Sequence, residues 1–160
     1  MRCMKPKLGP ALLDESSPLA QSIGYQTRLA YRKLEKYIQK ALVAHDIQIG
    51  MWYFLRVLWL EDGLTQRELS GRVGTTEPSA LEQLRKMETR GLIARRRSDG
   101  DRRKSLVVLT REGRSLEKKL LKYVDELNAV AFEGFSDGEI KLLRELLARL
   151  CRNVWRANEA

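Results

Sequence analysis

The densest group of side chains able to bind a ligand lies at residues 95–104, RRRSDGDRRK, which hold six basic residues, two aspartates and one glycine. Short apolar runs lie on either side, GLIA at 91–94 and SLVVL at 105–109. Apolar runs around a turn-forming SDGD at 98–101 are typical of a β-hairpin. Arginine is favoured in a narrow minor groove, where negative potential is concentrated. The stretch therefore predicts a β-hairpin that binds a nucleic acid.

Individual residues of this hairpin have separate expected roles. Arg102 and Arg103 lie at or just after the turn and are placed to enter a minor groove. Asp101 is expected to pair with one of them and to hold its side chain extended. Four more cations flank the strands within reach of phosphates: Arg95, Arg96, Arg97 and Lys104. The alternative is an exposed basic hairpin that serves only solubility.

The elements before the hairpin are those that would position it on DNA. The TQRE of residues 65–68 is a capping box for a short helix that ends at Val73, and Gly74 makes the turn. Thr76 can cap a second helix over residues 77–90. A short helix, a glycine turn, a second helix and a charged hairpin form a winged helix-turn-helix, whose second helix enters the major groove.

The expected DNA contacts of this unit lie at the helix starts and along the second helix. Hydroxyls and amides at a helix N-terminus can meet phosphate oxygens, and the first turns of the second helix face base edges. The apolar side of that helix is expected to pack on the helix before it: Ala80, Leu84 and Met87 against Leu69 and Val73. The expected contact residues are Thr65, Thr75, Thr76, Glu77, Ser79, Glu82, Gln83 and Lys86.

The N-terminal part of the chain divides into an arm and a long helix. Residues 1–17 contain two prolines, a glycine and two serines, and are predicted to form a flexible arm. Pro18 favours a helix start, with Ser16 or Ser17 as its cap. Apolar residues at helical spacing continue this first helix to about Ala44.

Three further helices complete the prediction. Residues 48–60 are apolar nearly all round, which indicates a central helix. Thr110 caps a fifth helix, and the capping box SDGE at 136–139 starts a sixth. The predicted fold class is therefore mostly α with a small β wing (α+β), a winged helix-turn-helix joined to a helical region.

Composition and motifs narrow the function classes. The formal net charge of +9 and the isoelectric point of about 9.8 favour a polyanionic partner. His45 is the only histidine and no phosphate-binding glycine loop is present, so no catalytic site, metal site or cofactor is predicted. Cys3 and Cys151 lack a CxxC spacing, which favours a reduced, cytoplasmic protein. Neither a targeting signal nor a membrane span is expected, since the most apolar window, 51–60, is short and contains Arg56.

Residues 64–116 together resemble the MarR family of bacterial transcription regulators. The motifs that carry the resemblance are LTQRELS, METRGLIARR, DRRK and LTREG. The resemblance implies an obligate homodimer whose two winged lobes straddle a pseudo-palindromic operator, usually to repress nearby genes. It also implies that the first, fifth and sixth helices interlock to form the dimer.

The apolar stripe of the fifth helix and the leucine row of the sixth support such a dimer independently, because a single lobe of this size is too small to bury both. The resulting domain assignment is a flexible arm at 1–17, a helical dimerisation region at 18–46 and 111–157, and a winged helix-turn-helix DNA-binding domain at 47–110. The alternative is that the stripes pack only within the monomer.

The second helix of the motif departs from the family pattern. Family members often have a basic residue where Glu77 or Glu82 stands, and a small polar residue where Pro78 stands. Acidic side chains repel phosphate but can accept a hydrogen bond from a cytosine amino group. The two glutamates therefore either set sequence specificity or face solvent beside Lys86.

Many family members respond to small phenolic compounds or aromatic carboxylic acids, which bind between the dimer helices and the winged lobe. An arginine among aromatic rings suits such a ligand, because the guanidinium pairs with the carboxylate and the rings stack. Arg28 and Arg56 are the candidate carboxylate partners, with Tyr31, His45 and Trp52 around them. The alternative is that the rings are ordinary core and the arginines reach the surface.

The sequence thus predicts a MarR-like DNA-binding transcriptional regulator, a repressor released by a small aromatic acid-type ligand. One alternative is a non-specific architectural DNA-binding protein. Another is a regulator that activates by displacing a silencer. An enzyme is disfavoured because no catalytic constellation is present, and a pure protein-interaction module would not need the arginine hairpin.

Overall fold

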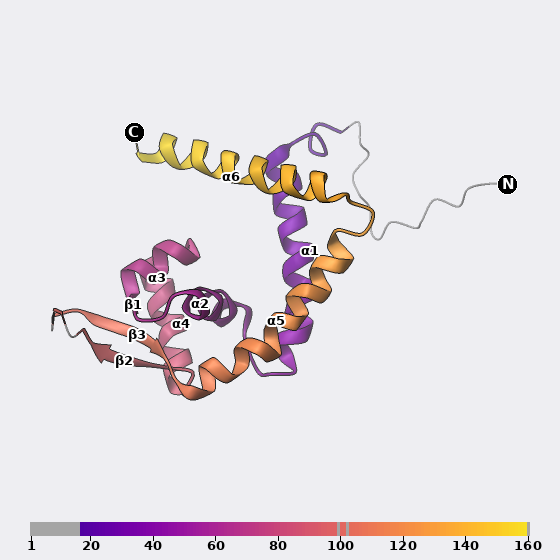
Figure 1. Cartoon of the computed structure of the whole chain (residues 1–160). Helices are drawn as coiled ribbons and strands as arrows, with labels where there is room; N and C mark the ends of the chain where they lie inside the picture. The colour runs from indigo at the N-terminus through magenta and orange to yellow at the C-terminus, as the bar shows by residue number, and fades with distance from the viewer. Residues whose placement is uncertain (1–16, 99, 102, 160) are drawn as a thin grey trace. The chain divides into compact units, whose positions relative to one another are not determined.

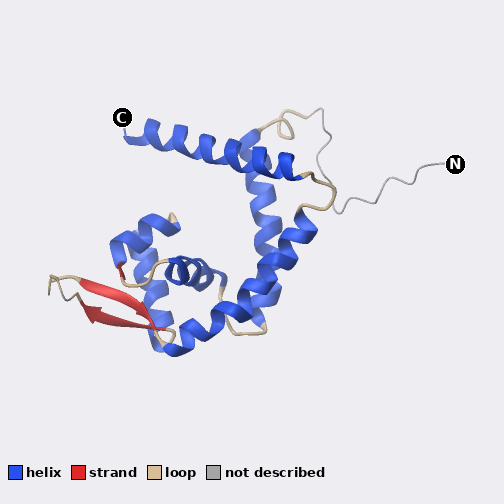
Figure 2. Ribbon diagram, viewed as in Figure 1, coloured by secondary structure: helices blue, strands red, loops and turns tan. Residues whose placement is uncertain are grey.

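The computed structural model describes residues 17–98, 100–101 and 103–159 (Figure 1). In this part of the chain, helices dominate and the strands form one small sheet (Figure 2). The elements are α1 (Ile23–Val43), α2 (Ile49–Leu60), β1 (Leu64–Thr65), α3 (Gln66–Val73), α4 (Glu77–Thr89), β2 (Ile93–Arg97), β3 (Ser105–Leu109), α5 (Arg111–Ala131) and α6 (Asp137–Glu159). The chain divides into two compact units, Met1–Tyr123 and Val124–Ala160. None of the described helices is long and apolar enough to cross a membrane.

The predicted class, mostly α with a small β wing, is confirmed, but the predicted start of the first helix is wrong. α1 begins at Ile23 and not at Pro18, and its cap is Ser22, whose hydroxyl accepts from the backbone amide of Tyr25. Ser17 closes a separate turn instead, because its hydroxyl accepts from the amide of Ala20 at 3.1 Å. The other proposed cap, Ser16, and the predicted arm up to it lie outside the described residues.

The central helix α2 agrees with its prediction and supplies more of the buried core of the first unit than any other element. Five of its twelve residues are buried: Met51, Trp52, Phe54, Leu55 and Leu58. A helix that is apolar on nearly every side is stable only when other elements surround it. Here α1, α3, α4 and β3 lie next to it.

The helix-turn-helix forms as its caps predicted. Thr65 and Glu68 close the capping box, with the Thr65 amide donating to Glu68 Oε2 at 2.8 Å and the Glu68 amide donating to Thr65 Oγ1 at 3.3 Å. Gly74 ends α3 in the left-handed conformation, φ +73°, which glycine adopts without steric cost. The turn therefore leads directly to Thr76, the N-cap of α4.

The wing is a three-stranded antiparallel sheet in the order β1-β3-β2. Arg95 pairs with Val107 and Arg97 with Ser105, so these arginines lie within strand β2. The prediction that GLIA forms the first strand is therefore wrong by two residues at its start, since Gly91 ends the helical segment with φ +68°. The short strand β1, which pairs Leu64 with Val107, was not predicted.

The start of α5 is fixed firmly to the base of the wing. Thr110 caps the helix as predicted, because its hydroxyl accepts from the amide of Gly113 at 3.1 Å. The Gly113 carbonyl accepts from the indole nitrogen of Trp59 at 3.0 Å. Asp62 accepts from the amide of Leu109 at 2.8 Å and pairs with Arg114. These bonds join α2, β3 and α5 within the first unit.

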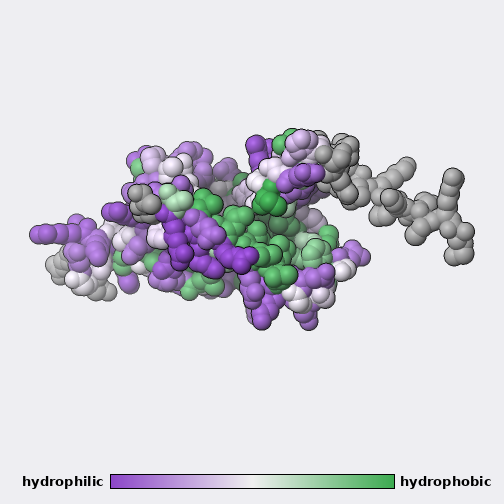
Figure 3. Space-filling view, turned by 90° about the horizontal axis from the view of Figure 1, so that it is seen from above, coloured by the Kyte–Doolittle hydropathy of each residue, from purple (hydrophilic) through white to green (hydrophobic). Residues whose placement is uncertain are grey.

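The second unit contains the end of α5 and all of α6. The predicted capping box is present, with Ser136 Oγ donating to Glu139 Oε2 at 2.7 Å and the Glu139 amide donating back at 3.3 Å. The apolar residues of α6 are exposed: Leu142, Leu143, Leu146, Leu147, Leu150, Val154 and Trp155. Figure 3 colours the hydrophobic residues green on the face in view.

Candidate nucleic-acid interface

Helix α4 has a buried side and an exposed side, as a recognition helix requires. Its apolar residues are buried as predicted: Ala80, Leu84 and Met87. Leu69 of α3 is also buried, whereas Val73 is half-buried. The opposite side exposes Ser79, Glu82, Arg85 and Lys86. The helix therefore presents hydroxyl, carboxylate and cationic groups along one accessible face.

Arg85 was missed by sequence reasoning. The signal was available in the helical period, because Arg85 follows Glu82 by three residues and so lies on the same side of the helix. A cation on this face suits both phosphates and the acceptor atoms of guanine.

The N-terminus of α4 is organised by a hydroxyl pair. Thr76 Oγ1 accepts from the amide of Ser79 at 3.4 Å and donates to the hydroxyl of Ser79 at 3.0 Å. Thr75 is half-buried, and its amide donates to the carbonyl of Ser70 at 3.0 Å. Glu77 is exposed in the first turn, where a carboxylate interacts favourably with the helix dipole. The arrangement leaves the Thr76 and Ser79 side chains at the accessible end of the helix.

Glu82 and Lys86 neutralise one another. The Lys86 ammonium donates to Glu82 Oε1 at 2.7 Å, and both side chains are exposed. This hydrogen bond lowers the pKa of Glu82. The carboxylate therefore stays ionised but meets a cation of its own helix, which reduces its repulsion of phosphate.

The tip of the wing is held by backbone and side-chain bonds. The Ser98 amide donates to the carbonyl of Lys104 at 3.0 Å, and the Lys104 amide donates to the carbonyl of Asp101 at 2.9 Å. Asp101 Oδ1 accepts from the backbone amide of Arg103 at 3.0 Å. Asp101 thus bonds to the backbone of Arg103, and its expected pairing with the side chain of Arg102 or Arg103 stays a prediction. Arg102 lies outside the described residues, and Arg103 and Lys104 are exposed.

The arginines of β2 do not share one environment. Arg95 is held by α4 and α3, with its Nε 3.5 Å from Glu88 Oε2 and its Nη2 donating to Gln66 Oε1 at 3.4 Å. Arg96 and Arg97 are exposed. Arg95 therefore braces the wing against the helices, while the next two arginines stay accessible on alternate faces of the strand.

Two of the predicted DNA-contact residues have side chains that contact other residues of the protein. The Thr65 hydroxyl donates to Glu68 Oε2 at 2.7 Å within the capping box. The Gln83 side chain lies against Gly50 of α2, and its carbonyl oxygen is buried with no hydrogen-bond partner among the described residues. Gln83 is thus turned away from the exposed row of α4.

The five candidate ligand residues fall into separate groups. Arg56 stacks over Trp52, with its guanidinium carbon 5.4 Å from the ring centre. Tyr31 donates to Glu35 at 2.7 Å, and its hydroxyl oxygen lies within hydrogen-bond distance, 3.1 Å, of the Tyr53 hydroxyl on α2. The Tyr53 bond is the main cause of the raised pKa of Tyr31. The structure therefore brings Arg56 and Trp52 together and ties Tyr31 to the same helix.

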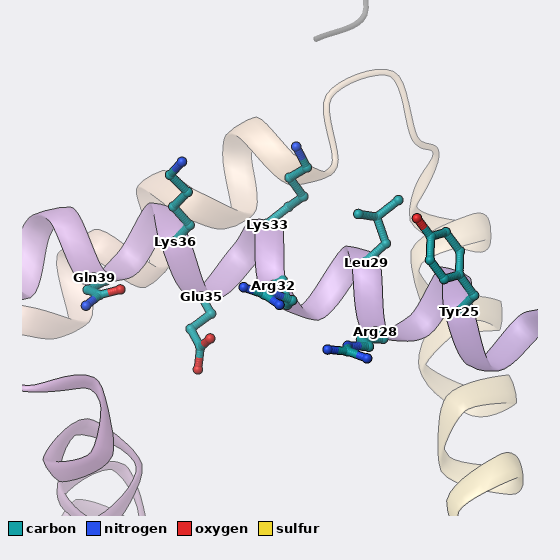
Figure 4. Close-up of a pocket in the computed structure, with 8 residues that line it drawn as sticks. All are labelled: Tyr25, Arg28, Leu29, Arg32, Lys33, Glu35, Lys36 and Gln39. Carbon is teal, nitrogen blue, oxygen red and sulfur yellow. The ribbon is translucent and has the colours of Figure 1, made fainter. Parts of the chain in front are cut away.

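His45 and Arg28 lie apart from that group. His45 Nε2 is 3.2 Å from the hydroxyl of Tyr123 on α5. Arg28 lines an open hollow of about 680 Å³ along α1 (Figure 4). Its lining residues are Tyr25, Arg28, Leu29, Arg32, Lys33, Glu35, Lys36 and Gln39. Among the described residues, no three histidines, cysteines or carboxylates gather as metal ligands would.

Comparisons with known proteins agree with this geometry. Residues 49–105 match the model of the family described as MarR. The chain is 26% identical over 132 residues to the HTH-type transcriptional regulator BilQ of Clostridium symbiosum, covering 82% of this chain and 92% of BilQ. A MarR transcriptional regulator from Methanosarcina mazei superposes with a TM-score of 0.76 at 28% identity, over 84% of this chain and 97% of that one. CouR from Rhodococcus jostii, bound to p-coumaroyl-CoA, gives a TM-score of 0.76 at 28% identity, over 84% and 95% of the two chains.

Proposed function

Because the chain belongs to the MarR family of DNA-binding transcriptional regulators, we propose that it is a homodimeric repressor of a pseudo-palindromic operator. Each protomer contributes one α4 to a major groove and one wing to the neighbouring minor groove. Binding of a small aromatic acid then releases the DNA. Each part of this proposal is supported by a different group of residues.

The observation that carries the DNA-binding mode is the tip of the wing. The Arg103 amide donates to Asp101, and the Lys104 backbone bonds to Ser98 and Asp101, so the backbone at Arg103 and Lys104 is hydrogen-bonded before DNA arrives. A fixed backbone lowers the ordering cost of binding. An exposed cation on a narrow hairpin suits a minor groove, where negative potential is concentrated.

The homodimer is supported by the apolar face of α6. Residues such as Leu146, Leu147 and Val154 expose 43%, 42% and 54% of their surface. A contiguous apolar row of this length marks an interaction surface. Because a regulator with two symmetric half-sites needs two recognition helices, a second copy of this chain is the proposed occupant.

The ligand response is supported by the Arg56–Trp52 pair. A guanidinium beside an aromatic face offers a partner for a carboxylate and a surface for stacking. CouR, one of the similar proteins, is bound to p-coumaroyl-CoA. We therefore place the aromatic part of the ligand near α2, with Tyr31 and Tyr53 as neighbouring hydroxyls.

The test begins with selection of binding sites from a random duplex pool by the unmodified protein. A specific regulator enriches one pseudo-palindromic sequence that resists competition by random DNA, whereas an architectural protein enriches none. Arg103→Ala should weaken binding to that duplex about tenfold. It should also reduce the slope of log affinity against log salt concentration by ~1.8 per dimer, because each of the two guanidinium groups in the minor groove neutralises about one phosphate charge.

Arg152→Ala on α6 is the matched control, because it removes the same charge from an exposed position outside the wing. Equal affinity of the Arg103 variant and the parent at moderate salt would exclude the wing as a DNA contact. Adding a panel of aromatic carboxylic acids to the complex tests the ligand response, and release by none of them would remove that part of the proposal.

A further inference from the structure

One side of the recognition helix α4 rests on the segment that joins α1 to α2. Gln83 and Arg90 lie seven residues apart, two helical turns, and so occupy the same side of the helix. Gln83 lies against Gly50, and Arg90 pairs with Asp46. Met87, one turn before Arg90, is fully buried. Residues 46–50 therefore form a packing surface for α4, which contacts it at Asp46 and at Gly50.

The contact at Gly50 depends on the absence of a side chain there. A Cβ added at Gly50 would lie 2.8 Å from both Cδ and Oε1 of Gln83, and 3.2 Å from Nε2. Real Cβ atoms essentially never lie below 3.0 Å from another heavy atom, and the atoms in the way are the end of the Gln83 side chain, so the amide would have to leave its place against α2. The amide of Gln83 thus occupies the volume that any other residue at position 50 would fill.

Gln83 contacts Gly50 through van der Waals packing and not through a hydrogen bond. The Oε1 atom of Gln83 is buried and accepts no hydrogen bond from the described residues. A buried acceptor without a donor costs free energy, so the amide adds no polar stabilisation at this oxygen. What Gln83 supplies is a fixed spacing between α4 and the first turn of α2.

The second contact is weaker. Arg90 Nη2 lies 2.9 Å from Asp46 Oδ2, but the Asp46 side chain is 92% exposed. Exposed ion pairs contribute little to stability. Asp46 also has a φ of +55°, which is unusual for a residue other than glycine. The ion pair orients the end of α4, whereas the Gly50 contact fixes its distance from α2.

We propose that Gln83 is a positioning residue that sets the recognition helix against α2 through Gly50, and not a residue that reads a base. The inference rests on the proposed function, because it concerns how α4 is presented to the operator. Gly50 belongs to the same helix as Trp52 and Arg56.

A double-mutant cycle tests this, using the duplex that the unmodified protein selects from a random pool. Gly50→Ala and Gln83→Ala should each weaken binding to that duplex about threefold, because each removes the same contact between the amide and α2. The double variant should bind within about threefold of the parent, because the new methyl group occupies the space that the amide leaves. Gly24→Ala is the matched control, since its Cβ meets only the Ser22 hydroxyl at 4.0 Å.

The opposite result would overturn the inference. If the losses of the two single variants multiply in the double variant, Gln83 and Gly50 act independently. Circular dichroism and thermal unfolding show whether Gly50→Ala folds. If it does not, repeating the selection with Gln83→Ala decides: a positioning residue leaves the preferred bases unchanged, and a base-reading residue relaxes the preference at one position. Failure of the parent to select any duplex would count against the proposed function instead.

Discussion

Two glycines in helices should respond in opposite ways to the same substitution. Gly113, in the first turn of α5, is pressed against the base of the wing: a Cβ there would lie 2.1 Å from the Leu92 carbonyl oxygen and 3.0 Å from Leu109 Cδ2. Gly71, inside α3, has nothing within 4 Å of the added atom. Replacing each with alanine adds one methyl group and the same gain in helix propensity.

The cost at Gly113 follows from the distance. A carbon atom needs about 3.3 Å from a carbonyl oxygen, the range of ordinary weak C–H···O contacts, so the two backbones must separate by roughly 1 Å. That separation strains the bond from the Thr110 amide to the Leu92 carbonyl and the bond from Trp59 to the Gly113 carbonyl. Overpacking costs about 1–3 kcal/mol and each weakened bond about 1 kcal/mol, against a propensity gain of about 1 kcal/mol. We therefore expect Gly113→Ala to lose about 2–4 kcal/mol and Gly71→Ala to gain about 0.5–1 kcal/mol.

Urea unfolding followed by circular dichroism measures both values, at one protein concentration because the stability of the proposed dimer depends on it. The wing should also lose its fixed base in Gly113→Ala, so affinity for the selected duplex should fall even where the protein is fully folded. A Gly113→Ala protein as stable as Gly71→Ala would refute the reasoning, because the close approach of α5 to Leu92 would then not exist in solution.

Two further outcomes follow from the charges and the apolar surface. Lys86→Met should weaken binding to the selected duplex more than Arg152→Ala does, because it leaves the Glu82 carboxylate unpaired. The Glu82–Lys86 pair lowers the pKa of Glu82 in the folded protein. The stability that the pair contributes is therefore present above the ordinary carboxyl pKa and is lost as the pH falls through the lowered value. An NMR titration of Lys86→Met should find the Glu82 pKa back at the ordinary carboxyl value. A Glu82 pKa equal to that of the parent protein would contradict the pairing. Leu147→Glu, on the exposed apolar row of α6, should convert the proposed dimer to monomers in sedimentation velocity, whereas Arg152→Glu should not.

The features that the sequence predicts best are those decided within a few residues. The capping boxes that begin with Thr65 and Ser136 need only a hydroxyl and a carboxylate three positions apart, and both form. The left-handed conformation of Gly74 is equally local. The start of α1 is local too, but two serines compete for it, and the pattern does not show that Ser17 closes its own turn.

Features that depend on distant segments escape such patterns. Strand β1 exists because Leu64 meets Val107, and the inward turn of Gln83 depends on a glycine 33 residues earlier. The bracing of Arg95 by Glu88 and Gln66 requires the wing to lie against both helices. A sequence motif lists which residues can bind DNA, whereas packing decides which of them remain free to do so.

The acidic residues of α4 illustrate this division. Glu77 lies in the first turn, where the helix dipole favours a carboxylate, Glu82 pairs with Lys86, and Glu88 pairs with Arg95. Each acid therefore has an explanation within the chain that requires no base. Arg85 makes no ion pair with any residue in the described ranges, and it lies on the exposed side. Because an unpaired guanidinium is free to approach acceptor atoms in a major groove, Arg85 is the side chain of α4 from which base recognition is expected to begin.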